Sequence, residues 1–502
     1  MTTTTSSEVD YADVQGLVRF GYKRMTTARY ELLRVKNAAA ARRWLFSAPV
    51  TSAVAMDPPP KTALHIALTA PGLRAIGVPE PVIEGFSHEF RAGMATEYRA
   101  RQLGDVGSNA HEYWQWGGPG REPHLVVMFF GEPGHLDAHF QNSTGGAWEE
   151  GFDVLHSLVA GLDVVEPFGF ADGISQPEID WKQQRETPTT QLEYTNVTAL
   201  GEILLGYRNE YGKITDRPLL DPDTRSAELL AAQDAPGKKD LGRNGTYLVM
   251  RQLQQDVRKF WQFVSEQAGG DAENAEKLAA AMVGRKRNGD PLVPIGSEAT
   301  PGAGSKPEHG QQNQFTFDSD ASGVRCPFGS HLRRANPRNA DFAQRPAGLL
   351  KKLLIVLGFG PKHFRYDLMS SVRFHRILRR GRRYGLPLTP QDALAPAPPD
   401  EPESGLHFMC LNANISRQFE FVQNAWIVNS KFSGMTGESD PLLGNREPIP
   451  GCPVTSDFNM PQEGGLRHRV SGLPQFVTVR GGAYFFLPSL RALRYFAGGV
   501  TV

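Results

Sequence analysis

The sequence predicts an α+β fold in which one architecture occurs twice. An apolar, β-rich run followed by an amphipathic helix recurs along the chain, before about residue 160 and again after about residue 240. Several of the apolar runs have apolar residues on both faces, as in LVVMFF. Such strands suit a sheet covered by helices, because every sheet must bury a face. At this level a parallel α/β arrangement remains open.

The recurring unit is found at four places, two in each half of the chain. The expected pairs of strand and helix are 28–37 with 38–48, 124–133 with 134–142, 246–254 with 255–269, and 406–414 with 415–428. No GxGxxG or GxxxxGK[ST] motif follows any of these strands, so the sequence does not support a nucleotide cofactor.

The size and charge of the chain exclude several classes of protein. Its 502 residues are enough for two or three domains. Its 54 lysines and arginines balance its 54 aspartates and glutamates, so no net charge attracts nucleic acid or an anionic membrane. The absence of a signal segment and of a run of about 18 apolar residues predicts a cytoplasmic protein without a membrane partner. The widely spaced Cys326, Cys410 and Cys452 are expected to be buried, reduced thiols.

Three stretches combine residue types that can carry chemistry. In CPFGSHLRRANPR (326–338), His331 has no second histidine or carboxylate nearby at metal-ligand spacing, so a hydrogen-bonded loop histidine and a ligand both remain open. In GFADGISQPEID (169–180), Asp172 lies between two glycines, where the backbone can approach a ligand closely or form a simple turn. The six arginines of SVRFHRILRRGRRYG (371–385) predict either a solvated basic face or an anion site.

Taken together, CPFGSHLRRANPR, GFADG and ILRRGRRYG resemble the dye-decolorizing peroxidases, a family of haem enzymes. Further similar stretches, such as LLGYRNEYG, MVGRKRNGDPL and SGMTGESDPLLG, extend the resemblance along most of the chain. The long loops resemble the larger branch with fungal and some bacterial members. The resemblance implies duplicated ferredoxin-like domains with antiparallel sheets flanked by helices. The expected domains are residues 1–235, with the GFADG loop, and residues 236–502, with the haem.

The resemblance also implies the cofactor and its ligands. One haem b per chain is expected, with His331 as the proximal axial ligand of the iron, because the porphyrin supplies the other four nitrogens. Arg333, Arg334, Arg338 and Arg345 are expected to be available to pair with the haem propionates, as guanidinium groups bind carboxylates bidentately, and the sequence leaves open which of them do so. Many relatives have an acidic residue that receives the other N–H of the proximal histidine. The nearest match in this sequence is Asn414, with Glu420 as the alternative.

On the opposite face of the haem, the family pattern makes Asp172 the acid–base residue and Arg379 its electrostatic partner, with Arg380 in reserve. Hydrogen peroxide must lose a proton from one oxygen and gain one on the other, which one carboxylate can accomplish. A fixed positive charge keeps that carboxylate ionised and stabilises the charge that develops as the O–O bond breaks. Leu406 and Phe408 are expected to cover this face of the haem and to keep the space above it apolar and narrow. The implied product is an oxoferryl haem.

The expected function is therefore a peroxidase that reduces hydrogen peroxide and oxidises dyes, phenolics or other one-electron donors. The alternative is a haem-binding or haem-processing protein without peroxidase turnover. Surface electron relays are conceivable at six tryptophans, although packing is the default for each of them: Trp114, Trp116, Trp148, Trp181, Trp261 and Trp426. The sequence leaves monomer and homodimer open.

Overall fold

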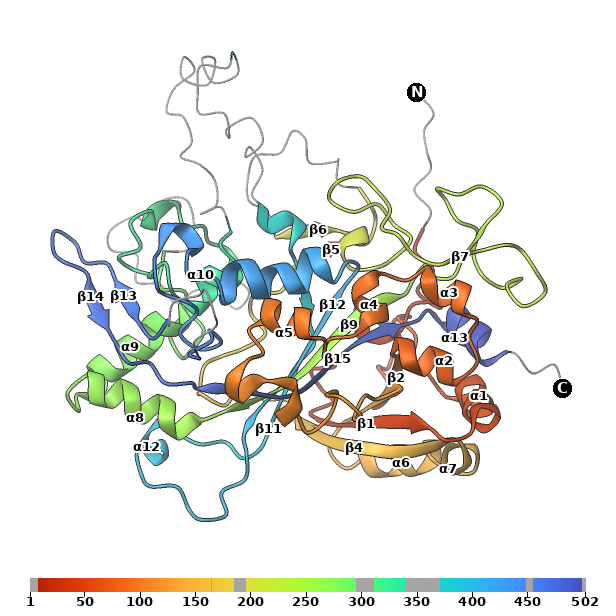
Figure 1. Cartoon of the computed structure of the whole chain (residues 1–502), viewed down its shortest axis with the longest axis horizontal. Coiled ribbons are helices and arrows are strands. Elements are labelled where there is room, and N and C mark those ends of the chain that lie inside the picture. The colour runs from red at the N-terminus through yellow and green to blue at the C-terminus, as the bar shows by residue number, and fades with distance from the viewer. Residues whose placement is uncertain are drawn as a thin grey trace.

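An antiparallel sheet of nine strands runs through the molecule, with helices flanking it (Figure 1). The computed structural model describes residues 8–163, 165–184, 196–294, 311–338, 357, 371–447 and 455–498. Every strand pair in the large sheet is antiparallel. The predicted α+β class is confirmed, and the parallel arrangement is excluded for this sheet.

The first half of the chain builds four strands of the sheet in the order β4-β1-β3-β2. These are β1 (Thr27–Val35), β2 (Thr62–Leu68), β3 (Leu125–Gly131) and β4 (Phe152–Gly161). Helix α1 (Ala38–Ser47) follows β1, while α6 (Leu136–Ser143) and α7 (Ala147–Gly151) connect β3 to β4. The Asn37 side chain caps α1 by accepting from Ala39 N and Ala40 N, which explains why the helix begins directly after the strand.

The second half repeats this arrangement in the order β11-β12-β9-β15. Its strands are β9 (Thr246–Gln255), β10 (Leu378–Arg379), β11 (Arg382–Tyr384), β12 (Gly405–Asn412) and β15 (Val477–Leu487). Helices α8 (Val257–Gln267) and α9 (Ala272–Val283) follow β9. In both halves the first strand pairs with the third and the fourth, so the duplicated ferredoxin-like fold is confirmed. The domain boundary at residue 235 stays a prediction.

The helix expected over 415–428 forms with a wider turn than predicted. Segments Ser416–Glu420 and Val422–Ile427 are π-helical, and Glu420 N donates to Ile415 O at 2.9 Å, five residues back. Wide turns of this kind are frequent at functional sites because they shift the side chains that follow them.

The remaining short elements are α2 (Ala70–Ala75), α3 (Glu80–Glu84), α4 (His88–Ala92), α5 (Glu97–Leu103), β5 (Glu178–Asp180), β6 (Val197–Ala199), β7 (Leu219–Leu220), β8 (Lys239–Asp240), α10 (His331–Ala335), α12 (Pro390–Ala393), β13 (Phe458–Met460), β14 (His468–Val470) and α13 (Leu490–Ala497).

The two halves join at their edges, so that the paired strands form a closed ring. Arg383 of β11 pairs with Gly161 of β4, and Phe486 of β15 pairs with Leu68 of β2. Since β9 pairs with both β12 and β15, the ring has no break. Closure of this kind removes the exposed edges at which sheets aggregate.

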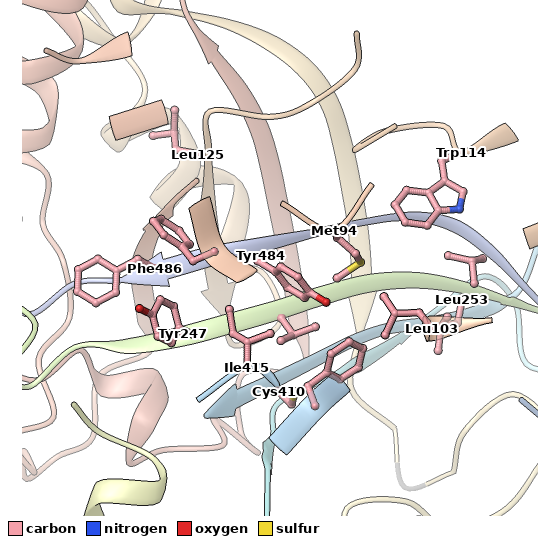
Figure 2. Packing of buried hydrophobic residues seen from close by; sticks show 14 of the residues in the cluster. Met94, Leu103, Trp114, Leu125, Tyr247, Leu253, Cys410, Ile415, Tyr484 and Phe486 are labelled. Carbon is pink, nitrogen blue, oxygen red and sulfur yellow. The ribbon is translucent and has the colours of Figure 1, made fainter. Parts of the chain in front are cut away.

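Alternate residues of each strand enter two different hydrophobic clusters. In β3, Leu125, Val127 and Phe129 belong to the outer cluster, which includes residues of α1, α8 and α9, while Val126 and Met128 belong to the inner cluster, built largely from strands of both halves. Figure 2 shows outer-cluster residues such as Tyr247, Tyr484 and Phe486 around β9 and β15. This division explains why the strands are apolar on both faces.

The expectation of reduced, buried cysteines is met within the described residues. Cys326 and Cys410 are buried and free, as predicted, and Cys452 lies outside the described residues. No described helix is long and apolar enough to cross a membrane. The cytoplasmic location stays a prediction.

We predict that Phe486→Ala destabilises the protein strongly. Phe486 is fully buried, lies at the strand pair that joins β15 to β2, and packs against Phe86, Tyr247 and Phe496. Truncation of such a side chain costs about 3–5 kcal/mol, because contacts are lost and a cavity remains. Denaturant unfolding followed by fluorescence measures the change. The matched control is Phe46→Ala, since Phe46 is 67% exposed. Equal midpoints for the two variants contradict the prediction.

Candidate active site

A cavity of about 280 Å³ lies between the GFADG loop, the end of β9, β12, α10 and the π-helical segment after β12. Most of its lining side chains are apolar. Five of the residues predicted from the sequence line it together: Asp172, His331, Arg379, Leu406 and Phe408. They come from four separate segments of the chain, which the fold brings to one place.

His331 is the first residue of α10, and Asp440 holds one of its ring nitrogens. Its Nδ1 lies 2.8 Å from Oδ2 of Asp440, which leaves Nε2 as the second ring nitrogen. The side chain is 31% exposed, and it lines the cavity. Burial lowers the pKa of His331, but the charge and the hydrogen bond of Asp440 outweigh burial and raise it overall. The imidazole is therefore oriented and made more basic by the carboxylate behind it.

Asp440 is itself fixed by the backbone of its own loop. It is fully buried, and its Oδ1 accepts hydrogen bonds from Leu442 N and Leu443 N, both at 2.9 Å. Burial raises the pKa of Asp440, but the His331 ring and these N–H groups outweigh burial and lower it overall. The carboxylate thus stays ionised beside the histidine.

The prediction that Asn414 receives the N–H of His331 is wrong. The side chain of Asn414 accepts from Arg417 N at 2.9 Å and so caps the turn that follows β12. The alternative, Glu420, accepts from Arg99 Nε and from Tyr484 Oη, each at 2.8 Å. Sequence reasoning missed Asp440 because 109 positions separate it from His331. The signal was present in the SGMTGESDPLLG stretch, where Asp440 is the acidic residue before the proline.

Asp172 and Arg379 form an ion pair that opens into the cavity. Arg379 Nη1 lies 3.0 Å from Asp172 Oδ1, and the two side chains are 31% and 40% exposed. Gln176 holds the backbone of Arg379 at both its N–H and its carbonyl group. Arg380 has a different environment, because its guanidinium group donates to the carbonyl oxygens of Leu17 and Val18. Arg379 is therefore the arginine of this run that contacts Asp172.

The electrostatics of this pair favour an ionised carboxylate. Burial raises the pKa of Asp172, but the charge of Arg379 and hydrogen bonds from Gly173 N and Arg379 outweigh burial and lower it overall. The neighbouring apolar wall comes from β12. Leu406 and Phe408 are two residues apart on this strand and so point to the same face, toward the cavity.

The arginines that follow His331 serve the packing of α10 and do not line the cavity. Arg333 is buried, with Nη1 bound to Asp320 at 3.0 Å and to Cys326 O at 2.7 Å. Arg338 is fully buried and donates to the backbone carbonyl oxygens of Asn313 and Phe315. Arg345 lies outside the described residues.

Two other arginines do line the cavity, Arg285 and Arg376. Arg285 donates to Gly289 O and to Ser175 Oγ, and Arg376 donates to Val197 O. Both were present in sequence stretches similar to the family, MVGRKRNGDPL and SVRFHRILRRGRRYG, but without any spacing that marked them as cavity residues.

The tryptophans are mostly buried within the protein. Of the six tryptophans considered as electron relays, the buried ones are Trp114, Trp116, Trp148, Trp261 and Trp426. Trp181 is half-buried and packs against Tyr11 with ring centroids 5.4 Å apart. Trp426 lines the cavity. Packing therefore accounts for the environment of all six.

No family model matches the chain. Dye-decolorizing peroxidase msp1 of Mycetinis scorodonius is 27% identical over 98% of this chain and 88% of its own length. The crystal structure of a decolorizing peroxidase from Auricularia auricula-judae, 25% identical, has a TM-score of 0.70 and covers 97% of this chain and all of that one. The chain is thus similar to dye-decolorizing peroxidases along nearly its whole length. The predicted resemblance to this family is confirmed, and it supports haem as the cofactor of a peroxidase.

A bacterial relative is similar over a shorter stretch. The multifunctional dye peroxidase DyP2 of an Amycolatopsis species is 30% identical over 347 residues, which are 66% of this chain and 61% of that protein.

The metal-binding side chains of the cavity suit haem, the cofactor of the dye-decolorizing peroxidases. Among the described residues, no group of three or more His, Cys, Asp or Glu side chains is arranged to hold a bare metal ion. Two histidines line the mostly apolar cavity: His375, whose ring stacks on Phe421, and His331, whose Nδ1 is held by Asp440. The second ring nitrogen of His331 suits a metal whose other ligands come from a macrocycle.

We predict that Asp440→Asn raises the ferric/ferrous potential of the haem-loaded protein. A neutral amide withdraws the His331 proton less than a carboxylate, so ferric iron is stabilised less. Each tenfold change in the ratio of the two states corresponds to about 59 mV in a one-electron couple. Spectroelectrochemical titration measures the midpoint. Asn414→Asp is the control and should leave the potential unchanged. If both midpoints equal that of the unmodified protein, the Asp440 contact does not tune the iron.

Proposed function

We propose that this protein reduces hydrogen peroxide to water at a haem held by His331 and oxidises one-electron donors such as dyes and phenolics. The observation that carries the proposal is the Asp172–Arg379 pair, which lines the same cavity as His331. A haem carrier needs neither an acid–base group nor a fixed charge beside it. This pair therefore favours turnover over the alternative of haem binding alone.

His331 would bind the iron of one b-type haem through Nε2, because Nδ1 is occupied by Asp440. Haem bound there supplies the redox-active iron at which peroxide is reduced. Arg285 and Arg376 line the cavity, and we propose them as partners of the haem propionates in place of Arg333 and Arg338. Their guanidinium groups already donate to nearby oxygens, which holds them in place.

Asp172 would take a proton from the peroxide oxygen nearer the iron and return it to the oxygen that leaves as water. Its lowered pKa keeps it available as a base over a wide pH range. Arg379 would stabilise the negative charge that develops on the oxygens, since it lies 3.0 Å from Asp172. Leu406 and Phe408 would exclude bulk water from this side of the cavity.

The direct test is an absorption spectrum of the purified protein before and after stoichiometric hydrogen peroxide, followed by addition of a phenolic donor. A peroxidase shows a haem band that changes with peroxide and returns with the donor. A haem band that peroxide leaves unaltered supports haem carriage instead.

We predict that Asp172→Asn and Arg379→Leu each slow the reaction with peroxide and leave the haem content unchanged. One positioned acid–base group contributes about 10²- to 10⁴-fold. Stopped-flow absorbance gives the second-order rate constant. Asp163 and Arg383 form a matched ion pair at 2.9 Å that does not line the cavity. Asp163→Asn and Arg383→Leu should keep the original rate constant. A normal rate in Asp172→Asn removes this residue from the proposed role.

We predict that the reaction with peroxide persists well below the reference pKa of an aspartate, about 3.9. Because Arg379 lowers the pKa of Asp172, the carboxylate stays a base until the pH falls through this lowered value. Removal of the positive charge should raise that pKa, so the acid limb of the pH–rate profile moves to higher pH in Arg379→Leu. The rate constants of both proteins across the acid range measure this shift. Coincident acid limbs contradict the role of Arg379.

A further inference from the structure

A second carboxylate of the cavity, Glu166, binds the turn that precedes Asp172. Its Oε1 accepts from Phe170 N at 2.9 Å, and its Oε2 accepts from Phe168 N at 3.0 Å. The backbone closes the same turn, since Glu166 N donates to Phe170 O at 2.9 Å and Gly169 N donates to Glu166 O at 2.8 Å. Gly169 has a φ of +94°, a conformation that favours glycine. The Glu166 side chain thus ties together the residues from which the GFADG loop starts.

Asp172 follows this turn after only one residue, so the position of the turn sets the position of its carboxylate. Both Glu166 and Asp172 line the cavity. The loop is held from outside by Ala171 N, which donates to Arg287 O at 2.9 Å, and by Trp261 Nε1, which donates to Phe168 O at 3.0 Å. Neither of these contacts involves Phe170 N. The Glu166 side chain alone of these three groups binds it.

No salt bridge to Glu166 occurs among the residues that the structure describes. The groups that face it are Gln255 of β9, whose Nε2 donates to Oε2 at 2.7 Å, and Asp172 on its own loop. Arg287 instead donates to Gly169 O and pairs with Glu276 at 3.7 Å. Burial raises the pKa of Glu166, and the negative charge of Asp172 raises it further. The hydrogen bonds from Gln255, Phe168 N and Phe170 N lower it, but burial outweighs them, and the resulting pKa is about 7. Glu166 therefore changes charge near neutrality, while Asp172 stays ionised there.

Gln255 offers a partner for either state of Glu166. Its Oε1 is buried and has no hydrogen-bond partner among the described residues. When Glu166 takes up a proton, its new O–H becomes a donor, and rotation of the Gln255 amide by half a turn presents Oε1 to it. The contact between the two side chains survives the change of charge. Two carboxyl groups whose surroundings push their pKa values apart are typical of acid–base sites.

We propose that Glu166 is a positioning residue for the peroxide reaction: it holds the turn that carries Asp172, and its charge tunes the proton affinity of Asp172. This inference rests on the proposed function of the cavity. An ionised Glu166 adds a negative charge to a site where peroxide must itself develop one. The reaction is therefore faster when Glu166 is neutral, and the rate constant falls as the pH rises through the pKa of Glu166.

The test compares Glu166→Gln, Glu166→Ala and the unmodified haem-loaded protein by stopped-flow across neutral pH. The unmodified protein should lose about 3- to 10-fold in rate constant toward alkaline pH, since an interaction of one pK unit corresponds to tenfold. Glu166→Gln should keep most of the acid-side rate and lack this fall. Glu166→Ala no longer holds the turn and should be slower at every pH. Glu178→Gln, at the exposed first residue of β5, should keep the original profile.

A second readout does not depend on activity. Infrared difference spectra between mildly acid and mildly alkaline solution report the C=O stretch of a protonated buried carboxyl group. The band of Glu166 should vanish in Glu166→Gln, while that of Glu202, whose pKa is also raised to about 7, remains as an internal reference. The two possible failures are distinct. An unmodified protein whose haem does not respond to peroxide overturns the proposed function. A responsive protein in which Glu166→Gln keeps both the alkaline fall and the band overturns the role of Glu166.

Discussion

The pairing of β9 with β12 on one side and β15 on the other is the constraint on which the cavity depends. It closes the ring of strands and fixes the register of β12, with Leu406 opposite Leu253 and Phe408 opposite Arg251. Because side chains alternate along a strand, a slip of one residue would turn Leu406 and Phe408 away from the cavity. The same register brings β10, with Arg379, against Cys410.

Buried arginines hold the irregular parts of the structure to this sheet. Arg334 donates to the carbonyl oxygens of Trp426 and Glu438, so it joins α10 to the π-helical segment and to the loop of Asp440. Arg382 similarly binds carbonyl oxygens of Tyr22 and Met25. A guanidinium group has five N–H donors, which suits loops whose carbonyl groups have no regular partner. The arginine runs of this sequence therefore serve mainly as hydrogen-bond donors to the carbonyl groups of loops. This explains why the prediction that Arg333 binds an anionic propionate fails.

The predicted elements were recovered with small changes because their signals are local. A strand such as β9 and the helix after it are marked by their own residues, and the Asp256 side chain caps α8 by accepting from Lys259 N. The cavity residues Asp172, His331 and Arg379 were recognised through short motifs that resemble a family. Asn414 was chosen by proximity to a motif, and this failed because hydrogen bonds to a ring nitrogen depend on distance in space.

By itself, the sequence determined the α+β class, the duplication and the residue types of the cavity, because hydrophobic periodicity and short motifs are properties of neighbouring residues. Only the tertiary structure decided which side chains meet. Asp172 and Arg379 are 207 positions apart, and His331 and Asp440 are 109 apart. Contacts over such separations arise from strand register and loop packing, in which many weak local preferences combine. The same packing decided that Glu166 lines the cavity and that Arg333 does not.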